Sequence, residues 1–302
     1  MHDLIIVGGG ASGFAAGVFA LSKELDFRMI YENRGGKSNW RQSLTDQKEP
    51  EFLAGAEALM LFERQVEAHR DSTIKDRVTT ITKKDRLFEV KTTRHGVLQS
   101  TAVIVCTGVT PIKLDVPGAD MFLGYGLGYS AITHTALLED RCVAVIGDTD
   151  RALRGVAEIS QKARQVYLIT PNATNLLSPL GIAVQYRPNV EVFQDCQIRE
   201  LTGSLSVEGL TVEQHGEVYT FDIDAAFVDL GLRPNSECVR KIVRTDRDGF
   251  IWVDDRNATT LPGMFAAGDV TTTFGEQALI AIGEGARAAL SAYDYILEHS
   301  VH

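Results

Sequence analysis

Cysteine is scarce in this sequence, and the scatter of the few cysteines excludes two kinds of site. The chain of 302 residues has four, at Cys106, Cys142, Cys196 and Cys238. A disulfide framework needs many cysteines in a short chain, and a metal cage needs them at close spacing. The sequence therefore predicts neither a disulfide-stabilised fold nor a bound metal.

Basic residues are in the minority, and long apolar runs are missing. Lys and Arg number 30 against 40 Asp and Glu, which gives a net charge of -10. An acidic chain binds nucleic acid or an anionic membrane surface poorly, because both are negatively charged. No apolar stretch approaches the ~18 residues of a membrane-spanning helix, and Met1-His2-Asp3 lacks the basic segment of a secretory signal. We therefore expect a cytoplasmic protein with no nucleic-acid partner and no membrane span.

What is present is typical of a globular protein of about two domains. At roughly 150 residues per domain, 302 residues are enough for two buried cores. Hydrophobic residues make up 44% and charged residues 23% of the chain, an ordinary balance. Among the 27 glycines, several lie in loops that follow apolar strands, and these loops indicate a ligand that approaches the backbone closely.

The first of these loops lies near the N-terminus. The apolar run Leu4–Val7 predicts a buried strand, and it leads through Gly8-Gly9-Gly10-Ala11-Ser12-Gly13 into a helix expected from Phe14 to about Lys23. This is the G-x-G-x-x-G pattern of a dinucleotide site in its required context. Its first glycine allows the tight turn, the second lets the backbone approach a pyrophosphate, and the third allows the helix to pack on the strand.

The next strand agrees with this interpretation. The predicted strand 27–31 ends in Glu32, which lies 19 residues after Gly13, where a ribose hydroxyl acceptor belongs. The alternative is a structural glycine turn in another kind of α/β protein. Because strand, loop, helix, strand and acid all occur in order, we predict a dinucleotide bound at this loop.

Three further fragments also consist of a predicted strand that leads into a loop containing glycine. The strand 102–105 ends in Cys106-Thr107-Gly108, and the segment Phe265-Ala266-Ala267-Gly268-Asp269 precedes a helix expected from Leu279 to Leu297. A second strand-glycine loop-helix unit begins at Cys142 with Gly147 in its loop. Two Rossmann-like units are therefore expected. The segment Glu57 to His69 predicts an amphipathic helix, with its apolar face formed by Leu59, Leu61, Phe62 and Val66.

Taken together, these motifs resemble the low-molecular-weight thioredoxin reductase family of flavoproteins over nearly the whole chain. The resemblance also includes Gly35-Gly36-Lys37 after Glu32, and Gly231-Leu232-Arg233-Pro234-Asn235. It implies an α/β fold with two Rossmann-like, three-layer ββα dinucleotide-binding domains, the second inserted into the first. We place the FAD domain at 1–115 and 244–302 and the inserted NAD(P)-binding-like domain at 116–243. It also implies a homodimer.

The resemblance implies which residues hold the FAD. Asp269 would accept from the ribityl chain, and Lys37, where the family has glutamine, either lies near the flavin or is a solvated loop lysine. Trp40 either covers a flavin face or packs beneath the loop. The full implied set is Gly8, Gly10, Ala11, Ser12, Gly13, Glu32, Lys37, Val78, Thr107, Gly108, Gly268, Asp269, Glu276, Gln277 and Ala278.

The chain departs from this family at the redox disulfide. The family has Cys-x-x-Cys-Asp, and the matching residues here are Ser130, Thr133 and His134. A hydroxyl forms no disulfide and, with a pKa far above that of a thiol, does not replace a thiolate. His134 could move a proton near neutral pH or could be a loop histidine without chemistry. We expect these three residues to border the redox side of the flavin.

A second departure concerns NADPH. In Gly147-Asp148-Thr149-Asp150-Arg151-Ala152 a threonine replaces the middle glycine and two acids stand where phosphates should bind. No Arg or Lys occurs between Gln165 and Arg187, so a 2′-phosphate would lack its partner. NADPH is therefore not expected in its usual place. The inserted domain is either a scaffold or holds another ligand, such as a second nucleotide or flavin.

These departures lead to three hypotheses. The first is an FAD-dependent oxidoreductase without a dithiol, whose flavin exchanges electrons directly with a small molecule or a redox protein such as ferredoxin. The second is a ferredoxin- or NAD(P)H-linked reductase of the same fold. The third is a flavin-binding sensor or scaffold without catalysis. The sequence does not name the electron donor or acceptor.

Overall fold

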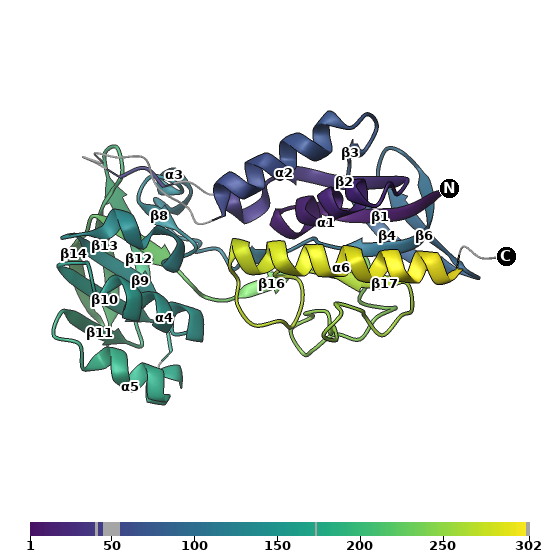
Figure 1. Ribbon diagram of the computed structural model, residues 1–302. Coiled ribbons are helices and arrows are strands. Elements are labelled where there is room, and N and C mark those ends of the chain that lie inside the picture. Colours follow the sequence, from purple (N-terminus) through teal and green to yellow (C-terminus); the bar gives the residue numbers. More distant parts are fainter. Residues whose placement is uncertain (40–41, 45–54, 173, 300–302) are drawn as a thin grey trace. The chain divides into compact units, whose positions relative to one another are not determined.

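The chain folds into two units that are discontinuous in sequence (Figure 1). The structure is a computed structural model that describes residues 1–39, 42–44, 55–172 and 174–299. Unit 1 comprises Met1–Asn39, Ala54–Thr110 and Arg233–His302. Unit 2 comprises Trp40–Leu53 and Pro111–Leu232, so that it is an insertion within unit 1.

Unit 1 is built on a seven-stranded sheet. Its strands follow the order β3-β2-β1-β6-β5-β4, and β17 pairs in parallel with β6. The central strands β1, β2, β6 and β17 are parallel, whereas β4 and β5 form an antiparallel extension. The strands are β1 (His2–Gly9), β2 (Phe27–Arg34), β3 (Thr73–Lys75), β4 (Val78–Lys84), β5 (Leu87–Thr92), β6 (Val97–Val105) and β17 (Met264–Ala266).

Both faces of this sheet are covered, which explains the unbroken apolar run of β1. Successive side chains of a strand point to opposite faces. Leu4 and Ile6 belong to the core shared with the helices, whereas Ile5 and Val7 belong to the core on the other face. The helices of unit 1 are α1 (Ala11–Ser22), α2 (Ala56–Ala68) and α6 (Ala278–His299), with a short 3-10 helix at Gly36–Asn39.

Unit 2 has a five-stranded parallel sheet of order β11-β10-β9-β15-β8 and a three-stranded antiparallel sheet of order β12-β13-β14. The strands are β8 (Leu127–Gly128), β9 (Cys142–Ile146), β10 (Gln165–Thr170), β11 (Val190–Gln194), β12 (Gln197–Gly203), β13 (Val207–Gln214), β14 (Glu217–Asp222) and β15 (Ala225–Val228). The helices are α3 (Ala119–Phe122), α4 (Asp150–Ile159) and α5 (Pro179–Gln185), with 3-10 turns at Ile132–Leu138 and Thr174–Leu177.

The alternation along β9 produces three layers in unit 2. Val143 and Val145 pack in a core with residues of α4 and α5, and Ala144 and Ile146 pack in a second core with residues of the three-stranded sheet. The predicted α/β class with two Rossmann-like units is confirmed.

The boundaries of the insertion differ from the expected residues 116 and 243. The chain leaves unit 1 at Pro111 and returns at Arg233. There the connecting strands β7 (Val109–Pro111) and β16 (Leu232–Pro234) pair with each other. The segment after Arg233 belongs to unit 1 because Val239 and Val243 pack in the same core as Ile5 and Val7.

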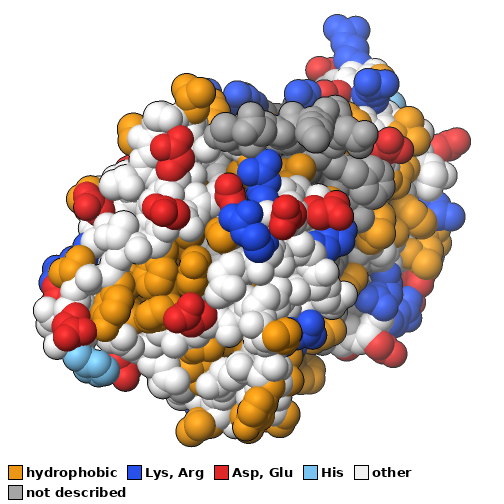
Figure 2. All heavy atoms as spheres, turned by 90° about the vertical axis from the view of Figure 1, so that its left-hand side faces the viewer, with side chains coloured by type: hydrophobic (Ala, Val, Ile, Leu, Met, Phe, Trp, Pro, Cys, Tyr) orange, Lys and Arg blue, Asp and Glu red, His pale blue; other side chains and the backbone are white. Residues whose placement is uncertain are grey.

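Two surface features bear on the kinds of partner expected. In the described part of the chain, no helix combines the length and the apolar character needed to cross a membrane. Figure 2 shows acidic and basic side chains interspersed on the face that it presents, rather than one sign gathered in a stripe.

Candidate functional site

The loop between β1 and α1 has the geometry that its glycines predict. Gly8 has φ +120, and a Cβ added there would lie 2.1 Å from the carbonyl oxygen of Cys106. A Cβ on Gly13 would lie 2.1 Å from the carbonyl oxygen of Gly8. Both positions therefore require glycine, because any side chain would collide with backbone.

The N-terminus of α1 is open. A Cβ built on Gly10 meets no atom within 4 Å. Gly10 is the N-cap, no side chain caps the helix, and its first turn, which includes Ala11 and Ser12, has no acid. The first N–H groups of a helix need acceptors and attract negative charge. This end of α1 can therefore accept a phosphate group.

The Gly268-Asp269 turn lies against this loop. The Ser12 hydroxyl donates to the carbonyl oxygen of Ala267 at 3.1 Å. Gly268 has φ +77, and a Cβ on it would come within 2.6 Å of Ser12 Oγ. The structure thus brings together the two sequence motifs that are farthest apart along the chain.

Lys37 links the segment after β2 to the same turn. The Gly35 N–H donates to the Gly9 carbonyl at 2.6 Å, which holds this segment next to the glycine loop. Lys37 Nζ lies 2.7 Å from Asp269 Oδ2 and 3.7 Å from Glu276 Oε2. Lys37 is therefore in an ion-paired cluster within the site and is not a solvated loop lysine. Gln277 and Ala278 follow at the start of α6.

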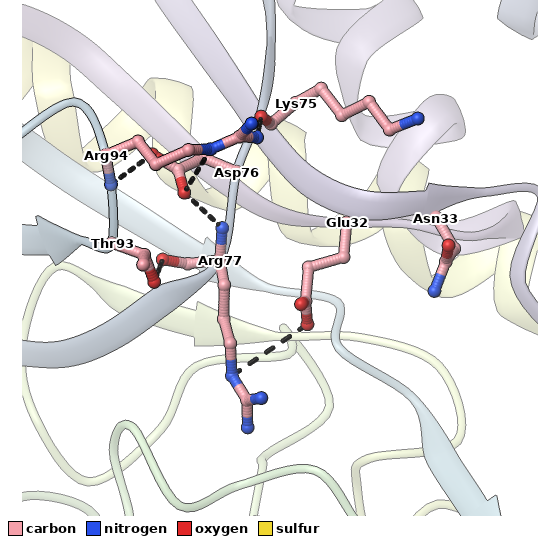
Figure 3. A pocket seen from close by; sticks show the side chains of 7 residues that line it. All are labelled: Glu32, Asn33, Lys75, Asp76, Arg77, Thr93 and Arg94. Atoms are coloured by element: carbon pink, nitrogen blue, oxygen red, sulfur yellow. Dashed lines mark hydrogen bonds and ion pairs between the residues drawn. The ribbon is translucent and has the colours of Figure 1, made fainter.

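A cavity of about 370 Å³ lies beside Glu32 (Figure 3). Glu32 and Arg77 point toward each other, with 3.9 Å between Glu32 Oε2 and Arg77 Nε. Val78, another residue of the implied set, follows directly as the first residue of β4. The cavity is lined by Glu32, Asn33, Lys75, Asp76, Arg77, Thr93 and Arg94.

Asp76, which lines this cavity, binds backbone N–H groups of two turns around it. Its carboxylate is buried and accepts from the backbone N–H groups of Arg77, Arg94 and His95 and from His95 Nδ1. Although burial disfavours the charge, these hydrogen bonds hold the pKa of Asp76 well below its ordinary value. Asp76 therefore stays ionised and fixes the two turns that form the cavity wall.

Thr107 and Gly108 are held by Asn235, which the sequence analysis named only as the end of the motif after Gly231. The Asn235 amide donates to the Thr107 carbonyl at 2.9 Å, and the Thr107 hydroxyl donates to the Asn235 carbonyl at 2.7 Å. The Asn235 N–H also donates to the Gly108 carbonyl. Its position in the motif after Gly231 was the available signal, but its partner lies 128 residues away in sequence.

These observations test whether an FAD would fit unit 1. FAD requires an anion site for its pyrophosphate, free space against the backbone and an acceptor for ribose hydroxyls. The uncapped helix with the open Gly10, and the cavity beside Glu32, supply these features. The residues present therefore fit the cofactor. Trp40 lies outside the described residues.

Ser130, Thr133 and His134 lie in unit 2. Ser130 Oγ and Thr133 Oγ1 are 2.7 Å apart and share a hydrogen bond. His134 is 2% exposed, and its ring stacks on Phe227 at 5.8 Å between centroids. The two hydroxyls thus lie in contact with each other, and His134 is a packed side chain of the unit 2 core.

The glycine loop of unit 2 is closed by its own side chains, unlike that of unit 1. Thr149 is the N-cap of α4: its hydroxyl accepts from the Ala152 N–H at 3.0 Å and donates to Asp229 Oδ1 at 2.9 Å. Arg151 Nε lies 2.7 Å from Asp229 Oδ2. Asp148 accepts from the Asn175 N–H at 3.1 Å. Asp229, which sequence analysis missed, is thus the internal anion of this loop.

The cysteines of the described residues are all free thiols. Burial raises the pKa of Cys106 to about 12 and the pKa of Cys238 to about 11. These two side chains therefore remain protonated near neutral pH and do not provide a thiolate.

Comparison with known proteins gives the family. The sequence pattern described as pyridine nucleotide-disulphide oxidoreductase matches residues 2–285, most of the chain. The chain belongs to the pyridine nucleotide-disulphide oxidoreductase family.

Relatives in this family are longer than the chain. A component of the alkyl hydroperoxide reductase of Staphylococcus epidermidis is 30% identical over 99% of this chain and 60% of its own length. NADH dehydrogenase of Bacillus subtilis is 31% identical over 98% of this chain and 59% of its own length. The chain therefore spans about 60% of these relatives.

Solved structures of the family have the same fold. Thioredoxin reductase from Streptococcus pyogenes superposes with a TM-score of 0.85 at 25% identity and covers 99% of each chain. Thioredoxin reductase from Giardia duodenalis has a TM-score of 0.86 at 22% identity, covering 98% of this chain and 99% of its own. The predicted thioredoxin reductase-like fold is confirmed.

Proposed function

We propose that this protein transfers electrons directly between bound FAD and a substrate or redox partner, without a dithiol and without NADPH in its usual place. The observation that supports this most is the hydrogen-bonded pair of Ser130 Oγ and Thr133 Oγ1, 2.7 Å apart, where the family has its two cysteines. Two hydroxyls accept no electrons under biological conditions, so a disulfide relay has no carrier here.

FAD, when bound, supplies the two-electron chemistry. The residues of unit 1 bind and orient it: the N-terminus of α1 binds the pyrophosphate, and Glu32 accepts from the ribose. Asp269, paired with Lys37, accepts from the ribityl chain. The donor is a two-electron organic reductant such as a hydroquinone, or a redox protein such as ferredoxin that delivers electrons singly, and the acceptor gains the same two electrons.

The glycine loop of unit 2 supports the part of the proposal that excludes NADPH from its usual place. A pyrophosphate at the N-terminus of α4 would have to displace the Thr149 cap and would meet the Asp229 carboxylate, which already pairs with Arg151. Like charges in this position oppose binding. Unit 2 then acts as a scaffold, and the homodimer expected of the family is part of this proposal.

The test uses the purified holoprotein under anaerobic conditions, with the visible flavin absorption as readout. We expect one FAD per chain, little bleaching by NADPH or NADH, and rapid bleaching by a hydroquinone or reduced ferredoxin. Rapid bleaching by NADPH or NADH would contradict the proposal and favour a nicotinamide-linked reductase, an activity that the name of the Bacillus relative contains. A flavin that no donor reduces would favour a binding protein.

A double-cysteine variant provides a positive control for the claim that the wild type has no redox-active dithiol. S130C/T133C replaces both hydroxyls by thiols at a pair of positions whose side-chain oxygens are already 2.7 Å apart. We expect the variant to lose two titratable thiols after mild oxidation, whereas the wild type loses none. Equal loss of thiols in the wild type would show that another cysteine pair exists and would contradict the proposal.

A further inference from the structure

Glu284, in the second turn of α6, lies at the junction between the two halves of the FAD site. Its side chain is 3% exposed, and its Oε2 accepts from the Gly268 N–H at 2.7 Å. The next residue, Gly285, lies against the other half, because a Cβ added there would come within 2.0 Å of the Ser12 carbonyl oxygen. Glu284 is thus fixed beneath the Gly268-Asp269 turn and beside the start of α1.

The second carboxyl oxygen of Glu284 is buried without a hydrogen bond. No donor among the residues that the structure describes lies within hydrogen-bond distance and geometry of Oε1. An ionised carboxylate needs partners for both oxygens, and leaving one buried and unpaired is costly. A neutral carboxylic acid meets this environment at lower cost because it carries no charge.

The pKa of Glu284 lies above its ordinary value because burial outweighs the hydrogen bonds and the nearby charges. Burial is the largest influence and raises the pKa of Glu284, and the Asp269 carboxylate on the facing turn adds to this. The Gly268 N–H, the Thr273 side chain and Arg287 oppose it.

The cationic side chains of Arg287 and Lys37 each bind another residue of unit 1. Arg287 donates to Asn257 Oδ1 at 2.7 Å, and Lys37 pairs with Asp269. The neighbouring thiol of Cys106, at the end of β6, is buried and uncharged. Among the described residues, no group in the junction therefore offers Glu284 a dedicated positive partner.

We propose that Glu284 is a positioning residue of the FAD site whose neutral form holds the Gly268-Asp269 turn, so that FAD binding is linked to protonation of this carboxyl. The inference rests on the proposed placement of FAD in unit 1. An ionised Glu284 would set a second carboxylate beside Asp269, where the anionic pyrophosphate must also bind. Bound FAD therefore favours the protonated form, and by linkage the affinity for FAD falls as pH rises through the pKa of Glu284.

The test is FAD titration of apoprotein between pH 5 and 8.5, for wild type, E284Q and E298Q. Glutamine has the size of glutamic acid, stays neutral and keeps an oxygen for the Gly268 N–H. We expect wild-type affinity to fall by up to about tenfold per pH unit above the pKa of Glu284. E284Q should bind at all pH values as the wild type binds at low pH, and E298Q, an exposed acid of the same helix, should retain the wild-type profile.

A purely structural role would weaken E284Q at every pH and leave its pH profile unchanged, which would overturn the proposal, as would a flat wild-type profile. Calorimetry of the wild type in buffers of different ionisation enthalpy gives an independent readout, and absence of proton uptake on binding FAD would also overturn it. If no variant binds FAD at any pH, the FAD site itself is wrong. Binding without pH linkage leaves the site intact and removes only the role of Glu284.

Discussion

At the scale of single residues, the glycines of the β1–α1 loop have different tasks although they are adjacent in sequence. Gly8 and Gly13 face backbone atoms 2.1 Å from where a Cβ would stand, so they are required for folding. Gly10 faces open space, and its φ of -93 is one that any residue adopts. Gly10 is therefore required only if something else occupies that space.

This difference leads to a prediction for G10A and G8A. We expect apo G10A to melt within a few degrees of the apo wild type but to bind FAD at least about tenfold more weakly, because the added methyl group occupies the path of the pyrophosphate. G8A should lower stability, since φ +120 alone costs about 1–2 kcal/mol before the collision with Cys106. Thermal unfolding and FAD titration measure the two effects, and wild-type affinity in G10A would exclude a pyrophosphate at this loop.

The residues that sequence reasoning missed share one property. Asn235, Asp229 and Glu284 all bond to partners that lie far away along the chain or in another element. Their residue types are ordinary, and although Asn235 belongs to the motif after Gly231, no local pattern indicates the partner of any of the three. The glycines, Glu32 and Asp269 were identifiable because their tasks depend on spacing within a strand-loop-helix motif.

At the scale of elements, the helices that follow the two glycine loops, α1 and α4, differ in how their N-terminal N–H groups are satisfied. The first turn of α1 has no side-chain cap and no acid, whereas α4 is capped by Thr149 and begins with Asp150. An uncapped N-terminus has N–H groups available for an anion, and a capped one has fewer. Two units of the same strand-loop-helix form therefore differ in their loop residues, so that the N-terminus of α1 can accept an anion and the N-terminus of α4 is closed by Thr149.

A substitution at the α4 cap tests this closure. We expect T149A to lower the stability of the protein by about 1 kcal/mol, because the Ala152 N–H loses its acceptor and Asp229 loses a donor. T149S keeps the hydroxyl and should restore most of the loss. Urea unfolding measures the difference, and equal stability of T149A and wild type would show that the cap contributes nothing.

In helix α2, the apolar pattern of the sequence predicts the buried face for three of the four residues expected there. Leu59, Phe62 and Val66, spaced by three and four residues, are turned inward: Leu59 and Val66 are buried and Phe62 packs against the core. Leu61 was expected on the same face but is 53% exposed. At about 100° per residue, Leu61 points away from the face that the other three share, so it does not reach the core of unit 1.

At the scale of the whole molecule, the long segment of unit 2 leaves unit 1 at β7 and the chain returns to unit 1 at β16. Each unit has its own apolar cores. The residues proposed for FAD all lie in unit 1, whereas Ser130, Thr133 and His134 lie in unit 2.

This division predicts where FAD stabilises the chain. Ligand at 100 times its Kd adds about 2.7 kcal/mol to the state that binds it. We therefore expect FAD to slow amide hydrogen exchange in the glycine loop, around Glu32 and at the Gly268-Asp269 turn, and to leave β9, α4 and β10 unchanged. NADPH should protect neither unit. Strong protection of α4 by either nucleotide would show that unit 2 binds a ligand.

Local sequence was sufficient for the fold class, for the glycine motif proposed to bind a pyrophosphate and for the strands and helices next to the glycine loops, because apolar periodicity and glycine spacing act over a few residues. The return to unit 1 at Arg233 was not predictable in this way, since it depends on Val239 and Val243 finding a distant core. The same holds for the pairing of Lys37 with Asp269 and for the burial of Glu284. Such contacts join residues more than two hundred positions apart, or place an ionisable group in a core, and their free energy depends on how the strands and helices pack rather than on any neighbouring residue.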